Sequence, residues 1–169
     1  MTRRSIGISK RAAVVTATAV LTLGTVGTVA ATAGPKDGNA KPSKAQIAGL
    51  FDNWNRTLQT GDPEKVADLY AKDAVLLPTV SNKVRTDHAG IVDYFEHFLQ
   101  NKPVGKKIQT IVNVLDKNSA IDTGVYEFTL TDPKTGAKST VEARYTYEYE
   151  KRGGEWLIVN HHSSKMPEG

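Results

Sequence analysis

The C-terminal third of the chain contains two stretches whose apolar and polar residues follow the pattern of β-strands. In residues 137–150 the alternation is strict from residue 141 on, where every second position is apolar and the positions between are polar or charged. The apolar positions are Val141, Ala143, Tyr145, Tyr147 and Tyr149. Residues 155–164 begin apolar and end with the polar run NHHSS, and Gly153-Gly154 supplies the positive φ angles of a tight turn. This pattern predicts a β-hairpin whose second strand leads from a core to a pocket or a surface.

Earlier in the chain, apolar positions recur at helical spacing in three segments. A capping box of Ser43 and Gln46 begins the first, and Gly61 ends it. Asp62-Pro63 begins a short helix over residues 63–71, and Thr86 or Asp87 caps a third that reaches residue 99. Further strands are predicted at residues 74–77, 107–115 and 120–131. This order predicts an α+β fold, with about three N-terminal helices packed on one face of a strongly curved antiparallel sheet.

The first 33 residues have the layout of a secretory signal peptide. Four basic residues accompany an uncharged, largely apolar run at residues 12–29, and Ala31-Thr32-Ala33 forms a cleavage site. An uncleaved membrane anchor is the alternative, but Thr, Gly and Ala dominate where an anchor would use Leu and Ile. We therefore expect cleavage after Ala33, a flexible linker over residues 34–42 and one domain over residues 43–169. The expected location is secreted, or extracytoplasmic, with the general and twin-arginine export routes both open.

Removal of the signal peptide changes the charge of the chain. The full sequence carries 22 basic and 18 acidic residues, a net charge of +4. Loss of the four basic residues before residue 34 leaves 18 of each sign, so the basic character gives no reason to expect nucleic-acid binding. The absence of cysteine excludes disulfides, so stability must come from an apolar core. We expect neither nucleic-acid nor membrane binding after cleavage.

The sequence contains no recognised pattern of a catalytic or cofactor site. It lacks a P-loop, the dinucleotide-binding glycines and the nucleophile elbow. The four histidines, His88, His97, His161 and His162, do not have the spacing of metal ligands. His161 and His162 are adjacent, so on a strand their side chains point to opposite faces. We therefore expect no metal and no cofactor.

Several short motifs resemble the bacterial members of the calcium/calmodulin-dependent protein kinase II association-domain family. They are Trp54, Thr60-Gly61-Asp62-Pro63, Leu69-Tyr70, VLLPTVS at residues 75–81, Tyr94-Phe95, Gly124-Val125-Tyr126, Ala143-Arg144-Tyr145-Thr146, Trp156-x-Ile158 and HHSSKMP at residues 161–167. The resemblance spans residues 45–167 and extends to SgcJ/EcaC-type proteins of the nuclear transport factor 2-like (NTF2-like) and SnoaL-like superfamily. It implies a cone-shaped, cystatin-like fold. The sequence contains no kinase domain, so the family name implies neither kinase activity nor calmodulin binding here.

The resemblance also implies a ligand pocket. In the kinase relatives the domain is an oligomerisation hub whose cavity holds several arginines and a histidine that accept small carboxylates. Only Arg144 matches one of those arginines, and the other matching positions hold Glu127, Ser163 and Ile91. Glu127 and Arg144 are expected on one face, either as a partly buried ion pair or as polar groups of the pocket. The residues expected to line the pocket are Trp54, Tyr70, Tyr94, Glu127, Arg144, His161 and His162.

The alternating tyrosines predict a protein interface. If Arg144 faces the cavity, then Tyr126, Tyr145 and Tyr147 lie on the opposite sheet face, and exposed aromatic patches are typical of interfaces. This arrangement predicts a homodimer or a larger ring. The alternative places the tyrosines beneath the helices and Arg144 outside.

These observations favour an exported, non-catalytic domain that homo-oligomerises and binds a small molecule, with anionic ligands among the candidates. A second hypothesis is a cofactor-free isomerase, dehydratase or cyclase, or an SgcJ/EcaC-type oxidoreductase, acting in the same pocket. Its base would be a terminal histidine or Glu127, and Arg144 would stabilise developing negative charge. A third hypothesis is a purely structural assembly module.

Overall fold

The chain folds as helices followed by strands. The computed structural model describes residues 40–167, so the predicted signal peptide and most of the predicted linker lie outside the described residues. The helices are α1 (Lys44–Leu58), α2 (Pro63–Ala67) and α3 (His88–Phe98), and the 3₁₀ turn η1 (Leu99–Asn101) follows α3. The strands are β1 (Tyr70–Leu77), β2 (Val104–Val114), β3 (Ser119–Thr131), β4 (Lys138–Arg152) and β5 (Glu155–Lys165). None of the helices within residues 40–167 is long and apolar enough to span a membrane.

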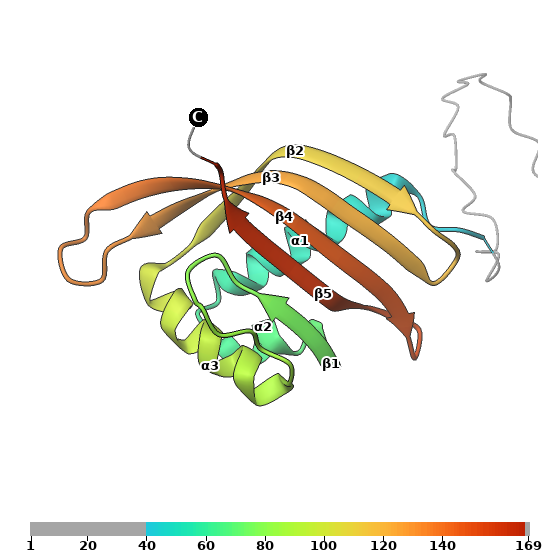
Figure 1. Ribbon diagram of the computed structural model, residues 1–169, viewed down its shortest axis with the longest axis horizontal. Coiled ribbons are helices and arrows are strands. Elements are labelled where there is room, and N and C mark those ends of the chain that lie inside the picture. The colour runs from blue at the N-terminus through green and yellow to red at the C-terminus, as the bar shows by residue number, and fades with distance from the viewer. Residues whose placement is uncertain (1–39, 168–169) are drawn as a thin grey trace, which may run out of the picture. The chain divides into compact units, whose positions relative to one another are not determined.

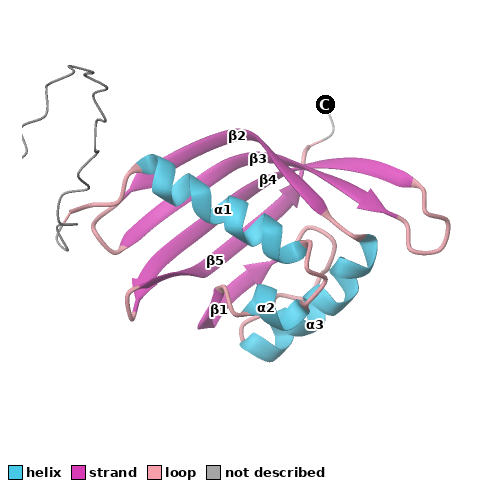
Figure 2. Cartoon of the chain, turned by 180° about the vertical axis from the view of Figure 1, so that it is seen from behind, coloured by secondary structure: helices cyan, strands magenta, loops and turns pink. Residues whose placement is uncertain are grey.

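All five strands form one curved sheet in the order β1-β5-β4-β3-β2. The helices lie on one face of this sheet, which we call the inner face, and α1 crosses it (Figures 1 and 2). Strands β2 to β5 are antiparallel neighbours, which confirms the predicted α+β arrangement. Strand β1 runs parallel to β5, which the sequence did not predict. Along the chain, α3 lies between β1 and β2. In the sheet, β1 is an edge strand beside the last strand, β5, and not beside β2.

The polar residues before the helices cap them as predicted. The Ser43 hydroxyl accepts a hydrogen bond from the Gln46 backbone, and the Gln46 side chain accepts one from the Ser43 backbone. Asp62 and Asp87 accept hydrogen bonds from the first turns of α2 and α3. These local contacts satisfy backbone N–H groups that a helix leaves free at its start.

Helix α2 is shorter than the sequence predicts. It ends at Ala67 rather than at residue 71. The reason is tertiary, because the carbonyl oxygen of Leu69 accepts a hydrogen bond from the backbone of Ile158 in β5, 2.9 Å away. Tyr70 then begins β1, and its backbone pairs with β5 instead of continuing the helix.

The alternating tyrosines of β4 form the core of the protein. Tyr145, Tyr147 and Tyr149 are at most 2% exposed and face α1. Phe51 and Trp54 of α1 pack on them, with ring centroids 6.2 Å apart for Phe51–Tyr145 and 5.7 Å apart for Trp54–Tyr147. Close aromatic pairs of this kind stabilise a core beyond the area that they bury.

This packing makes the predicted contact between copies through Tyr126, Tyr145 and Tyr147 wrong, because α1 of the same chain covers these side chains. Alternation shows only that the two faces of a sheet differ. The buried face is the one on which the aromatic stripe of α1 packs, and this is the face that carries the tyrosines. Arg144 consequently lies exposed on the opposite side, which we call the outer face.

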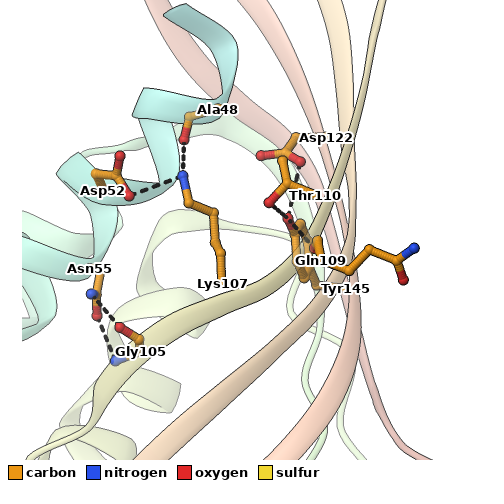
Figure 3. Close-up of polar contacts among 9 residues, drawn as sticks. All are labelled: Ala48, Asp52, Asn55, Gly105, Lys107, Gln109, Thr110, Asp122 and Tyr145. Carbon is orange, nitrogen blue, oxygen red and sulfur yellow. Dashed lines mark hydrogen bonds and ion pairs between the residues drawn. The ribbon is translucent and has the colours of Figure 1, made fainter. Parts of the chain in front are cut away.

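Polar contacts fasten α1 to β2 (Figure 3). The Asn55 side chain donates to the carbonyl oxygen of Gly105 and accepts from its N–H, both at 2.8 Å. The Lys107 ammonium donates to the carbonyl oxygen of Ala48 at 2.7 Å and pairs with an Asp52 carboxylate oxygen at 3.0 Å. These contacts hold the helix over the inner face and fix its register against the sheet.

Strands β2 and β3 approach so closely at Gly124 that no side chain fits there. A Cβ at this position would lie 1.9 Å from the carbonyl oxygen of Gln109, beside the irregularity in β2 at residues 107–109. We expect Gly124→Ala to lower the free energy of unfolding by about 2 kcal/mol or more, because backbone must move to admit the methyl group. Gly49→Ala is the matched control, since Gly49 lies in open space within α1. It should stabilise the protein by about 0.5–1 kcal/mol. Urea unfolding measures both, and equal effects would contradict the argument.

Candidate functional site

A cavity of about 180 Å³ lies between α1, α3 and the inner face of the sheet. Aromatic side chains supply most of its wall. They are Trp54, Tyr94, Phe95, Phe98, Tyr126 and Phe128. Its polar or charged lining residues are Thr79, His161, Ser163 and Lys165. A dry cavity of roughly 150 Å³ can hold one benzene molecule, so this volume suits a compound with a single ring.

A chain of hydrogen bonds fixes His161 at the cavity wall. The Trp54 indole N–H donates to the Tyr70 hydroxyl oxygen at 3.1 Å. The Tyr70 hydroxyl lies 2.9 Å from His161 Nδ1. Because indole can only donate, the Tyr70 oxygen accepts, and the Tyr70 proton is available for His161 Nδ1. This order makes Nδ1 the acceptor and places the proton of the neutral imidazole on Nε2.

His161 Nε2 is a buried donor without an acceptor. Its side chain is 4% exposed, and no group in residues 40–167 bonds to Nε2. Burial lowers the pKa of His161 to about 3, with a smaller effect from the charge of His162. The imidazole is therefore neutral at pH 7 and offers one N–H rather than a positive charge. An acceptor on a bound molecule would satisfy it.

A second polar point lies on the same wall around Ser163. The Tyr126 hydroxyl donates to Ser163 Oγ at 2.5 Å, and Ser163 also bonds to the Thr79 hydroxyl. Burial raises the pKa of Tyr126, so this phenol stays protonated near neutral pH. The three hydroxyls satisfy one another, whereas Nε2 of His161 is the buried polar atom of this lining that lacks a partner within residues 40–167.

Four of the seven residues predicted for the pocket come together here. Trp54, Tyr94 and His161 line the cavity, and Tyr70 lies directly behind them, bonded to both Trp54 and His161. They come from α1, β1, α3 and β5, so the tertiary fold assembles them from distant parts of the chain.

The other three predicted residues, Glu127, Arg144 and His162, lie on the outer face and do not reach the cavity. Arg144, His162 and Thr146 border a shallow depression there. His162 of β5 is the register partner of Thr146 of β4. Glu127 and Arg144 share this face, as predicted, but they form no ion pair. As predicted, His161 and His162 point to opposite faces of the sheet, and His161 is the residue that points inward.

The sequence did not identify a buried carboxyl group at Asp122. This side chain is fully buried on the inner face, and the Tyr145 hydroxyl donates to it at 3.1 Å (Figure 3). The Thr110 hydroxyl lies 3.2 Å from the same phenol. Burial raises the pKa of Asp122 to about 6, while the Tyr145 hydrogen bond opposes the rise. Asp122 does not line the cavity, but its even spacing from Gly124 and Tyr126 places it on the buried face.

Sequence reasoning also missed Thr79 and Phe98 as lining residues. Thr79 follows the end of β1 in a polar loop, where no periodicity indicates direction. Phe98 belongs to the apolar stripe of α3, which predicted burial without distinguishing core from cavity. Ser163, which the resemblance matched to a cavity position, could have been added to the expected lining, because it stands two residues after His161 and so shares its face.

Comparison with known proteins places this geometry in a family. Residues 43–167 match the family described as the calcium/calmodulin-dependent protein kinase II association domain. A crystal structure of a protein from Xanthomonas campestris, assigned to that same domain type, is 59% identical with a TM-score of 0.73. The match covers 77% of this chain and 94% of that chain. No curated protein shows significant similarity to the sequence.

More distant structures share the fold. The association domain of the Caenorhabditis elegans kinase is 14% identical with a TM-score of 0.59, over 72% of this chain and 95% of that chain. A nuclear transport factor 2-like superfamily protein from Salmonella enterica is 15% identical with a TM-score of 0.63, over 73% and 91%. The predicted NTF2-like fold is therefore confirmed, and at these identities the likeness concerns the fold alone.

Proposed function

The chain belongs to the calcium/calmodulin-dependent protein kinase II association-domain family, and from this premise we propose that it binds a small, mostly apolar molecule in its cavity without transforming it. The ligand is a single-ring compound that carries a hydrogen-bond acceptor such as a carbonyl oxygen. The observation that carries the proposal is the unpartnered Nε2 of His161 on an apolar wall. A buried donor without an acceptor costs about 1–3 kcal/mol, which an acceptor on the ligand offsets.

The acid–base groups favour binding over catalysis. Within residues 40–167 no carboxylate lines the cavity. His161 has a pKa of about 3 because of its burial, whereas a general base works best near the operating pH. Glu127, the other base considered from the sequence, lies on the outer face. These positions support a non-catalytic role for the cavity.

Two ring compounds of nearly equal shape test the proposal. Acetophenone carries an acceptor oxygen, and ethylbenzene does not. We expect acetophenone to bind about fivefold more tightly to the wild type in calorimetric titrations, since one hydrogen bond contributes about 1 kcal/mol. His161→Phe should abolish this preference while it retains ethylbenzene binding. His162→Phe, the same substitution on the outer face, should leave the preference intact. Failure of both compounds to bind the wild type would refute the proposal.

We also propose that the chain forms homo-oligomers through the outer face. No helix of the described residues covers this face, which is turned toward the viewer in Figure 1. Ile111 on it is 50% exposed, and Val125 is half-buried. Arg144 and Glu148 lie four residues apart on β4, so two copies related by a twofold axis can pair opposite charges. The family takes its name from association, which supports this role.

Native mass spectrometry of the protein purified from its own host tests the assembly. We expect a dimer or a larger ring, and Ile111→Glu should convert it to a monomer. Val84→Glu is the matched control, because Val84 is 48% exposed but lies in a loop away from the sheet. A monomeric wild type at micromolar concentration would exclude the interface. The same spectrum tests the proposed export, since cleavage after Ala33 leaves a chain that begins at Gly34.

A further inference from the structure

Arg85 is a buried cation whose donors are mostly unused. Its side chain is 8% exposed. Nη2 pairs with an Asp93 carboxylate oxygen at 2.9 Å, but Nε and Nη1 have no partner anywhere in residues 40–167. A guanidinium carries five N–H donors, and burying them without acceptors is costly. The structure therefore contains a buried cation with two nitrogens that lack an acceptor within residues 40–167.

The neighbouring backbone holds Arg85 in place. Its N–H donates to the carbonyl oxygen of Leu76 at 3.0 Å, and its own carbonyl oxygen accepts from Leu76 at 2.8 Å. The side-chain carbons pack against Gly90 of α3, where an added Cβ would lie 3.4 Å from Arg85 Cδ. The guanidinium is thus positioned before any ligand arrives, which lowers the entropic cost of binding.

Arg85 borders an open hollow of about 340 Å³ next to the cavity. The other polar residues of its lining are Ser81, Tyr94, His97 and Asn101, and no aspartate or glutamate belongs to it. Burial raises the pKa of Tyr94 while the charge of Arg85 opposes the rise, which is consistent with a guanidinium near the phenol. On its other side Arg85 borders a depression that contains Asp87 and Asp93, a surface that repels anions.

We propose that this hollow is an anion site in which Arg85 binds a small oxyanion, either a carboxylate or a phosphate. The planar guanidinium suits the geometry of both groups. Asp93 is 49% exposed, so water screens its charge far more than that of the buried Arg85. The site is distinct from the cavity. Val80, Tyr94 and Phe98 lie between the two and line both of them. It extends beyond the proposed function, because it needs no cavity ligand.

The test follows the Arg85 Nε–Hε signal by NMR while sodium phosphate or sodium acetate is added at constant ionic strength. The signal is assigned by its loss in Arg85→Lys. We expect saturable shifts at millimolar concentrations, and the anion that saturates first identifies the preferred class. Arg85→Gln should weaken binding at least tenfold, as measured by the anion-dependent rise in Tm, and Tyr94→Phe about threefold.

Arg144→Gln is the matched control, because Arg144 is an exposed arginine on the outer face, and its affinity for anions should equal that of the wild type. If Arg85→Gln does not fold, the wild-type titration and Tyr94→Phe decide the question. The absence of any saturable shift with either anion at 50 mM, or equal binding by folded Arg85→Gln, would overturn the anion site. Neither result affects the cavity, which the titrations with ring compounds test separately.

Discussion

The difference in the free energy of unfolding between His161→Phe and the wild type will be about 3 kcal/mol more favourable to the variant at pH 4 than at pH 7. In the folded protein, burial and then the charge of His162 lower the pKa of His161 from 6.5 to about 3. Below pH 6.5 the unfolded chain gains a proton that the folded chain cannot accept. His161 therefore supports folding above pH 6.5 and loses that contribution as the pH falls toward 3. Each pH unit is equivalent to about 1.4 kcal/mol, so the interval from 6.5 to 4 removes about 3 kcal/mol.

Urea unfolding at pH 7, 5.5 and 4 measures this effect. His162→Phe is the control, because it is the same substitution at the neighbouring exposed residue and should follow the wild-type profile. A His161→Phe profile parallel to that of the wild type would show that the imidazole gains its proton in the folded state. That result would also remove the neutral donor on which the ligand proposal depends.

Asp122→Asn will have the opposite pH dependence. Burial raises the pKa of the Asp122 carboxyl from 3.8 to about 6. Between these values the folded chain holds a proton that the unfolded chain has released, so the contribution of Asp122 is complete below pH 3.8 and is lost as the pH rises through 6. The asparagine cannot ionise and does not lose it. Relative to the wild type, Asp122→Asn should therefore gain about 2 kcal/mol between pH 4 and pH 7.

The two groups titrate over overlapping ranges with opposite sign. We expect the free energy of unfolding of the wild type to change little between pH 6 and pH 4, while each single variant slopes steeply in its own direction. The double variant should again be nearly flat and serves as the control for both. Asp73, whose pKa the Arg152 hydrogen bond lowers from 3.8, titrates below this interval. If the stability of Asp122→Asn depended on pH in the same way as that of the wild type, this carboxyl would be ionised in the core.

Local patterns in the sequence predicted the elements well. The capping box at Ser43, the aspartate caps and the glycine turn at residues 153–154 involve neighbours in the chain, and all are present. The end of α2 was wrong because its cause, the pairing of Leu69 with β5, lies almost ninety residues away. Propensity cannot register such a contact, and tertiary structure overrides it.

The candidate site was only half predictable for the same reason. Alternation established that His161 and His162, or Arg144 and Tyr145, point to opposite sides of the sheet. Which side is inside depends on where the Phe51 and Trp54 stripe of α1 lands, and no local signal specifies this. Arg85 lies in a loop without periodicity, so its burial could not be inferred. The family resemblance led to the prediction that Arg144 points inward. That prediction was wrong, because the aromatic side chains beside Arg144 fill the core.

The parallel pairing of β1 with β5 has a consequence for the order in which the protein folds. The hydrogen bond from Tyr70 to His161 joins residues 91 positions apart in the chain. Closing so long a loop is entropically costly, and contacts of high sequence separation generally form slowly. The β2–β5 meander requires only neighbouring hairpins, whereas the cavity wall requires the last strand to meet the first. We therefore expect the ligand site to be among the last parts of the molecule to form, and a nascent chain that still lacks β5 to have a folded α1 but no site.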